Sequence, residues 1–263
     1  MADLFCGVDA GAATTKVVVA DASGGILGSA VSRSGIDFAG TARKDLDEAL
    51  SGAGRDRASI IRTISTGYGR TNVDFADGAM TEIACHAAAV HFRFPRPVTV
   101  VDIGGQDSKV IRIDAGGRRT GFRMNRKCAA GTGAFLEEIA LRLDVDLSEL
   151  DRLAHGATDP VSLGSFCTVF TMTEILGLIR HGRRIEDIAH GVYDSVVKRV
   201  LEMDPLEGEV VMTGGVVEHN SMVPELLSAR LGRTVAVLER AQLAGAHGAA
   251  LIAARDRPET DSK

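Results

Sequence analysis

The stretch "GVDAGAATTKVVVAD" (residues 7–21) recurs in altered form as "VDIGGQDSKVIRID" (residues 101–114). Each copy contains an Asp, a glycine turn, small polar residues and a Lys, and continues as an alternating apolar run. Apolar, β-branched segments on both sides of a glycine turn predict a β-hairpin. The repetition therefore predicts that one structural unit occurs twice in this chain.

The spacing of apolar residues outside the hairpins supports this interpretation. In each half, strand and helix patterns follow one another in the order β-β-β-α-β-α, which predicts two similar α/β domains. We expect the boundary near "FPRPV" (residues 94–98), with a first domain at residues 1–96 and a second at residues 97–263. The last helical pattern, at residues 241–254, is expected to pack back on the first domain.

Composition limits the classes of function. With 263 residues, of which 45% are hydrophobic and 25% charged, the chain can form two modest globular domains. A formal net charge of -5 and the absence of a basic stripe argue against nucleic acid as a partner. No apolar run approaches the roughly 18 residues of a membrane span, and the first residues lack the features of a signal peptide. We therefore expect a cytoplasmic protein without membrane contact.

The hairpin tips are candidate phosphate sites. Backbone N–H groups and hydroxyls at a glycine turn suit phosphate oxygens. Asp9 and Asp102, which precede the turns, would repel a bare phosphate, so a Mg²⁺ ion between carboxylate and phosphate is predicted. Two ordinary β-hairpins are the alternative, although "VVMTGGVVEHN" (residues 210–220) adds a third glycine turn after a strand. Neither G-x-G-x-x-G nor G-x-x-x-x-G-K-[ST] occurs, which argues against a Rossmann site and a P-loop.

Three motifs carry a resemblance to a superfamily. "DAGAATTK" (residues 9–16), "DIGGQDSK" (residues 102–109) and "MTGGVV" (residues 212–217) resemble the two phosphate motifs and the adenosine motif of the sugar kinase, Hsp70 and actin ATPases. The resemblance implies two ribonuclease-H-like domains with ATP in the cleft between them. It also implies three groups of nucleotide-binding residues: Ala12, Ala13, Thr14, Thr15 and Lys16 on one side of the phosphates, Gly104, Gly105 and Gln106 on the other, and Gly214 and Gly215 at the nucleoside.

The four cysteines suggest a metal centre. Cys128 and Cys167 are each predicted at the start of a helix, where the positive end of the helix dipole favours a thiolate. Cys6 and Cys85 lie in apolar patterns and are expected in the core. A 4Fe-4S cluster takes four thiolates and structural zinc usually takes four ligands, whereas one chain offers two thiolates. A two-fold dimer would supply four, with one cluster on the axis.

The cysteine segments narrow the resemblance. "NRKCAAGTGAFLE", "SFCTVF", "STGYGR", "TEIACHA" and "DIGGQDSKVI" resemble signatures of the BadF/BadG/BcrA/BcrD ATPase family, which includes the homodimeric activators of 2-hydroxyacyl-CoA dehydratases, over residues 5–253. The family implies a 4Fe-4S cluster held by Cys128 and Cys167 of two subunits, ATP-driven delivery of one electron to a partner dehydratase, and an upstream donor such as ferredoxin or flavodoxin. Thr132 and Gln242 match its nucleotide contacts. Arg126, Ala134 and "TMTE" (residues 171–174) depart from its usual text, which leaves the choice of partner open.

Roles in hydrolysis follow from these assignments. Asp9 and Asp102 would hold Mg²⁺ through water, Lys16 or Lys109 would offset phosphate charge, and Gln106 would orient the attacking water. The alternative for each lysine is a solvated strand residue. Cys128 and Thr132 lie four residues apart, so the "CAAGTG" segment is a candidate link between cluster and nucleotide. The seven histidines show no shared metal-ligand spacing and are expected to be structural or exposed.

Other functions remain compatible with these motifs. An ATPase subunit of a benzoyl-CoA reductase is an alternative within the same family. A small-molecule kinase of the sugar kinase type, with incidental cysteines, belongs to a different class. A regulatory ATPase with structural zinc is the third alternative.

Overall fold

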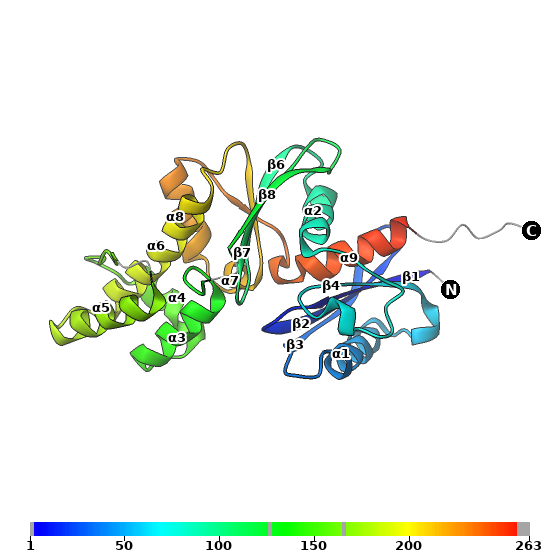
Figure 1. Ribbon diagram of the computed structural model, residues 1–263, viewed down its shortest axis with the longest axis horizontal. Helices are drawn as coiled ribbons and strands as arrows, with labels where there is room; N and C mark the ends of the chain where they lie inside the picture. The colour runs from blue at the N-terminus through cyan, green and yellow to red at the C-terminus, as the bar shows by residue number, and fades with distance from the viewer. Residues whose placement is uncertain (1–2, 126–127, 165–166, 257–263) are drawn as a thin grey trace, which may run out of the picture. The chain divides into compact units, whose positions relative to one another are not determined.

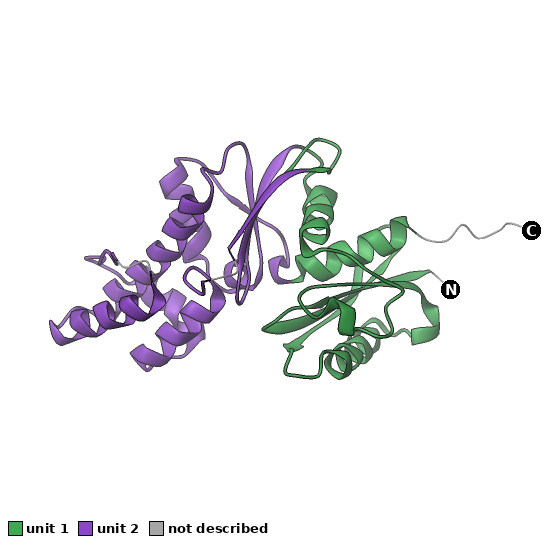
Figure 2. Cartoon of the chain, in the orientation of Figure 1, with its two compact units in different colours: residues 1–96, 113–119, 243–263 green, residues 97–112, 120–242 purple. Residues whose placement is uncertain are grey.

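The computed structural model describes residues 3–125, 128–164 and 167–256. The chain forms two compact units, coloured separately in Figure 2. The first contains residues 1–96, 113–119 and 243–263, and the second contains residues 97–112 and 120–242. Each unit therefore includes chain that is distant in sequence, and the units are not the continuous halves 1–96 and 97–263.

The first unit is built on a mixed five-stranded sheet in the order β3-β2-β1-β4-β5 (Figure 1). β1 pairs antiparallel with β2, which pairs antiparallel with β3, whereas β4 lies parallel to β1 and to β5. Fully buried β1 forms the centre of the sheet, which fits its apolar sequence. The strands are β1 Leu4–Ala10, β2 Thr14–Asp21, β3 Ile26–Arg33, β4 Ile60–Thr66 and β5 Gly78–Ala79.

The second unit repeats this strand order. Its sheet runs β8-β7-β6-β9-β10, so each strand occupies the place of the strand five numbers lower in the first unit. β9 is parallel to both β6 and β10, as β4 is to β1 and β5. The predicted α/β fold with a duplicated unit is confirmed. The strands are β6 Val98–Ile103, β7 Ser108–Ile113, β8 Arg119–Asn125, β9 Val210–Thr213 and β10 Ala236–Val237.

Helices cover the first sheet, and glycines set how closely they approach. α1 Phe38–Ala53 packs on β2 and β3, and α2 Glu82–Arg93 packs against α9 Ala244–Arg255. α9 also lies on β1, where a Cβ added to Gly7 would stand 1.9 Å from the Ala246 carbonyl oxygen. A Cβ on Gly248 would stand 1.8 Å from the Cys85 carbonyl oxygen. The last helix therefore completes the core of the first unit.

The 3₁₀ turns Arg57–Ser59 and Arg70–Asn72 flank β4.

Within the described residues, the second unit inserts four helices between β8 and β9, where the first unit has α1 and a 3₁₀ turn in the equivalent position. Among them, α4 packs on α6, and Leu150 and Ala154 of α4 are buried. The sequence patterns had not indicated α4. The helices of this unit are α3 Gly133–Leu143, α4 Leu147–His155, α5 Thr168–Arg180, α6 Ile185–Met203, α7 Gly215–His219 and α8 Met222–Leu231, followed by the 3₁₀ turn Ala241–Leu243, whose last residue belongs to the first unit.

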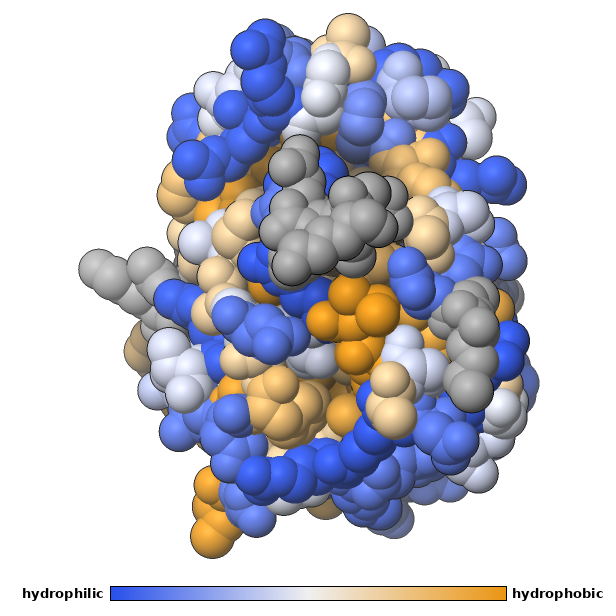
Figure 3. Space-filling model, turned by 90° about the vertical axis from the view of Figure 1, so that its right-hand side faces the viewer, coloured by the Kyte–Doolittle hydropathy of each residue, from blue (hydrophilic) through white to orange (hydrophobic). Residues whose placement is uncertain are grey.

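One face of the protein is mainly polar (Figure 3). Figure 3 shows one face on which hydrophilic residues predominate and hydrophobic residues appear in separate areas. Among the described residues, no helix combines the length and the apolar character that a membrane crossing requires.

Candidate functional site

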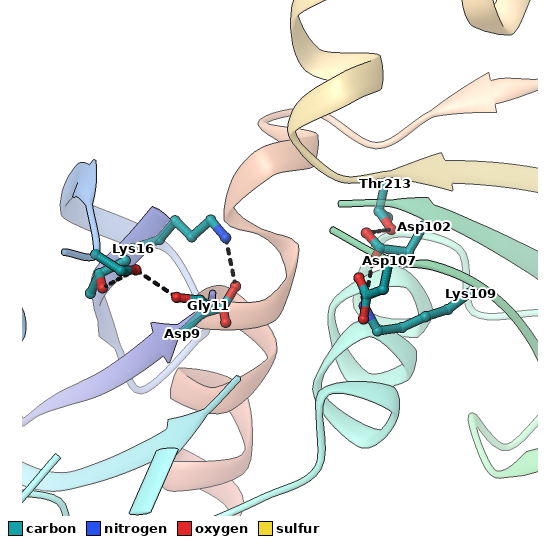
Figure 4. A network of polar contacts seen from close by, with 9 residues as sticks. Asp9, Gly11, Lys16, Asp102, Asp107, Lys109 and Thr213 are labelled. Carbon is teal, nitrogen blue, oxygen red and sulfur yellow. Dashed lines mark hydrogen bonds and ion pairs between the residues drawn. The ribbon is translucent and has the colours of Figure 1, made fainter. Parts of the chain in front are cut away.

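The two hairpins place an Asp and a Lys at equivalent positions. In the first unit Asp9 lies near the end of β1 and faces Lys16 of β2 in register, and the Lys16 Nζ lies 3.1 Å from Asp9 Oδ2. In the second unit the Lys109 Nζ lies 3.1 Å from Asp102 Oδ2 and 2.8 Å from Asp107 Oδ1 (Figure 4). Each carboxylate that precedes a glycine turn is thus paired with an ammonium group from its own sheet.

The Asp9–Lys16 and Asp102–Lys109 pairs differ in burial. Lys109 is 2% exposed, so its alternative interpretation as a solvated strand residue is wrong. The Lys16 side chain is 15% exposed and is also paired. Because each lysine offsets the charge of its aspartate, the carboxylates alone no longer require a cation to accept a phosphate.

The two aspartates differ in their free oxygens. Asp102 accepts the Thr213 hydroxyl on Oδ1 at 3.0 Å and the Lys109 ammonium on Oδ2. Asp9 accepts Lys16 on Oδ2, whereas its Oδ1 has no protein hydrogen bond among the described residues. Glycines border this carboxylate: a Cβ on Gly67 would stand 2.7 Å from Oδ1, and one on Gly245 would stand 2.9 Å from Oδ2. Asp9 therefore retains the oxygen that suits a magnesium-bound water.

Ser34 fixes the tip of the first hairpin. Its backbone N–H donates to the Ala13 carbonyl at 3.1 Å, and its hydroxyl donates to the Gly11 carbonyl at 2.5 Å. The Thr15 hydroxyl lies 2.9 Å from the same Ser34 oxygen. Thr15 is fully buried, so its side chain holds the turn together, while Ala12 is exposed at the tip and Ala13 and Thr14 are partly exposed. No sequence motif pointed to Ser34, which lies 19 residues from Thr15.

The second hairpin presents the other predicted phosphate residues. Gly104 N–H donates to the Asp107 carbonyl at 2.9 Å, which closes the turn, and Gln106 is exposed at its tip. Gly104 and Gly105 accept backbone bonds from Gly133 and Ala134 at 2.9 and 2.7 Å. The turn is therefore tied to the start of α3.

A third group gathers around the glycine pair after β9. Gly214 has φ 101° and lies against Asp102, so a side chain there would be strained and would meet the Ile103 carbonyl oxygen at 2.3 Å. Gly215 lies against Gln242, whose Oε1 is 3.0 Å from His219 Nε2. Gly214 and Gly215, predicted at the nucleoside, and Gln242, predicted to contact the nucleotide, are thus neighbours within the second unit. Thr213, which the sequence analysis missed, lies directly before them.

The predicted cluster cysteines are the accessible thiols. Cys128 is exposed and Cys167 is partly exposed, whereas Cys6 and Cys85 are buried. Burial raises the pKa of the Cys6 and Cys85 thiols to about 12, which keeps both protonated and unsuited to metal binding. No group of three or more His, Cys, Asp and Glu side chains within the described ranges has the arrangement of a metal site. Each chain thus offers two soft ligands.

The two accessible thiols lie in different local structures. Cys167 is the N-cap residue of the 13-residue helix α5, as the sequence indicated. The prediction that a helix begins at Cys128 is wrong, because Gly131 adopts φ 82° and Thr132 is extended, so α3 begins at Gly133. The Thr132 hydroxyl is buried and donates to the Ala129 carbonyl at 2.6 Å. Arg126 lies outside the described residues.

Comparison with known proteins identifies the family. Residues 6–253 match the model of the BadF/BadG/BcrA/BcrD ATPase family. The chain belongs to this family. It is 40% identical over 250 residues to the activator of lactoyl-CoA dehydratase of Anaerotignum propionicum, covering 94% of this chain and 96% of the relative. It is 38% identical over 260 residues to the 2-hydroxyisocaproyl-CoA dehydratase activator of Clostridioides difficile, covering 98% and 97%.

Solved structures agree with this membership. Component A of the Acidaminococcus fermentans (R)-2-hydroxyglutaryl-CoA dehydratase matches with a TM-score of 0.92 at 36% identity, over 97% of this chain and 99% of the other. The Clostridium difficile activator with bound ADPNP matches with a TM-score of 0.90 at 36% identity, over 97% and 95%. One of the benzoyl-CoA reductase subunits of Thauera aromatica is 28% identical over 210 residues, 77% of this chain and 74% of the relative. A Streptomyces griseus glucokinase, 16% identical with a TM-score of 0.56 over 96% of this chain and 99% of the other, shares the fold.

Proposed function

We propose that this protein is an ATP-hydrolysing electron-transfer protein that activates a partner 2-hydroxyacyl-CoA dehydratase. The observation that carries the proposal is the pair of accessible thiols, Cys128 and Cys167, on a chain of this ATPase family. Relatives of nearly equal length are named as activators of such dehydratases, which supports the same role here.

The available ligands fit a cluster shared between two chains. Two accessible thiols per chain are too few for a 4Fe-4S cluster, and the buried thiols stay protonated. We therefore propose a homodimer in which Cys128 and Cys167 of both subunits hold one cluster. When bound, the cluster supplies a one-electron carrier.

ATP would provide the energy for electron delivery. Raising one electron by 100 mV costs about 2.3 kcal/mol, so strongly reducing delivery needs a coupled reaction. The Asp9–Lys16 and Asp102–Lys109 hairpins would bind the phosphates, and Asp9 Oδ1 would hold a magnesium-bound water. Gln106, exposed at its turn, would orient the attacking water. The electron would come from a ferredoxin or flavodoxin in the cytoplasm.

Anaerobic purification with metal analysis tests this function. We expect a brown protein with about 4 Fe per dimer, and both Cys128→Ala and Cys167→Ala should lose the iron. Cys6→Ala is the matched control, because it removes a buried thiol and should keep the iron. A colourless wild-type protein, or iron undiminished in Cys128→Ala, would contradict the proposal.

The second candidate is an ATPase subunit of a benzoyl-CoA reductase. The similarity to the Thauera aromatica reductase chain favours it. Such a chain would copurify with a second, different ATPase chain when it is isolated from its native cells, whereas the activator would be isolated as a homodimer.

A further inference from the structure

Thr15 and Ser108 occupy equivalent positions in the two hairpins. Each is the sixth residue after the aspartate and directly precedes the lysine that pairs with it. Because side chains alternate along a strand, each hydroxyl points away from its Asp–Lys pair. Both residues are buried, so each hydroxyl needs a partner inside its own unit.

The two hydroxyls have different partners. In the first unit the Thr15 hydroxyl meets Ser34 just after β3, so the hairpin is fastened to its own sheet. In the second unit the Ser108 hydroxyl donates to the Gly131 carbonyl at 3.0 Å. Gly131 lies in the cysteine segment, by which we mean residues 128–134, from Cys128 to the first residues of α3. The duplicated position thus fastens one hairpin to the sheet and the other to the cysteine segment.

Three hydrogen bonds between described residues join the second phosphate turn to this segment. Besides the Ser108 bond, Gly133 N–H donates to Gly104 and Ala134 N–H donates to Gly105. These bonds hold both arms of the turn, so a displacement of the turn must move residues 131–134 or break them. The Thr132 hydroxyl, in contrast, is used within the segment itself.

The segment has little freedom to absorb such a movement. Gly131 has φ 82°, and a Cβ there would stand 2.9 Å from the Arg199 Cβ on α6. On its other side, Cys128 is held to the end of β8, because Asn125 Nδ2 donates to the Cys128 carbonyl at 3.2 Å. Cys128 therefore lies between an anchor on β8 and an anchor on the phosphate turn.

We propose that Ser108 is a positioning residue for Cys128, which links the position of the Gly104–Gly105 turn to the position of that thiol. The relevance of this link to electron transfer rests on the proposed function. The link itself is a property of the protein without metal, so it can be measured without a cluster.

Alkylation of the metal-free protein tests the link. The rate of Cys128 alkylation by iodoacetamide is measured by peptide mapping with saturating ADP and with a saturating non-hydrolysable ATP analogue, and Cys167 in the same sample serves as reference. Wild type should show different Cys128 rates in the two states. Ser108→Ala should reduce this difference, because it removes one of the three hydrogen bonds that join the turn to the segment. Ser108→Thr keeps the hydroxyl and should preserve the wild-type ratio.

Ser34→Ala is the matched control in the other copy. It loosens the first hairpin but has no bond to the cysteine segment among the described residues, so the Cys128 ratio should persist. A wild-type ratio of one, an unchanged ratio in Ser108→Ala, or an equal loss in Ser34→Ala would overturn the proposal.

Hydrogen exchange gives a second test that needs no variant. In wild type, the Gly133 and Ala134 amides should change protection between the two nucleotide states together with residues 104–108, and unchanged protection would overturn the link. If anaerobically purified wild type contains no iron, the proposed function is wrong, but the alkylation and hydrogen-exchange measurements still test the link between the turn and Cys128.

Discussion

Lys16 and Lys109 hold equivalent positions but differ in burial, which predicts unequal effects of mutation. Lys109 lies among Asp102 and Asp107 and is almost fully buried, whereas Lys16 retains some exposure. Removing one partner of a buried ion pair leaves an uncompensated charge and costs about 3–5 kcal/mol. Lys109→Ala should therefore lower the free energy of unfolding by about 3 kcal/mol or more.

Lys16→Ala is the control for this prediction and should cost less, because Lys16 and Asp9 are more exposed than Lys109 and Asp102. Urea unfolding without nucleotide measures both variants. Equal losses in the two variants would show that the difference in burial has no energetic consequence.

The buried thiols predict a loss of stability at alkaline pH. Cys6 and Cys85 have folded-state pKa values of about 12, above the ordinary value of 9.0. The folded state therefore keeps protons that the unfolded chain releases above pH 9, and the free energy of unfolding falls as pH rises. Each thiol contributes up to about 1.4 kcal/mol per pH unit. Urea unfolding between pH 8 and 10 should give a shallower dependence for Cys6→Ala than for wild type; identical slopes would contradict the assignment.

At the scale of elements, the contacts of α9 predict where glycine is indispensable. A Cβ on Gly248 would overlap the Cys85 carbonyl oxygen of α2, so Gly248→Ala must separate two helices that pack backbone to backbone. We expect a loss of about 3 kcal/mol or more in the free energy of unfolding, as overpacking of a core implies.

Gly52→Ala in α1 is the matched helical control. A Cβ at this position meets nothing within 4 Å, so the change should stabilise the protein by about 0.5–1 kcal/mol through helix propensity. Thermal unfolding of both variants measures the contrast. A Gly248→Ala protein as stable as wild type would refute the close packing.

The sequence predicted most elements, but in the second unit it missed α4 and the short helix α7 and misplaced the start of α3. Apolar periodicity located the strands except β5, and the repeated motif predicted two similar α/β units, which the shared strand order confirms. α4 was missed because it has nine residues and depends on burying Leu150 and Ala154 rather than on a long pattern. The start of α3 was placed too early because the backbone conformation of Gly131 is not visible in composition.

At the scale of the whole molecule, sequence distance limited what could be predicted. Motifs located Asp9, Lys16, Asp102 and the cysteines, since each lies in a local signature. Thr213 reaches Asp102 across 111 residues, and no local pattern reports such a contact. The grouping of residues 113–119 with the first unit is non-local in the same way.

Deleting residues 243–263 tests the dependence of the first unit on the last helix. Ala249, Ile252 and Ala253 of α9 share a buried cluster with Phe5, Ile64 and Cys85. Without α9 this cluster is exposed, so β1 and β4 should lose protection from hydrogen exchange while β6 and β9 of the second unit keep theirs. Retained protection in β1 would show that the first unit folds without α9.

The return of α9 to the first unit also affects synthesis on the ribosome. β1 leaves the ribosome before all of the second unit, whereas α9, the helix that covers β1, leaves it after the second unit. Until α9 is synthesised, the apolar face of the first sheet that α9 covers stays exposed, although Cys128 and Cys167 have already been synthesised. The core of the first unit can therefore close only after the residues of the second unit have been synthesised, and chaperones that shield apolar surface should bind the growing chain during that interval.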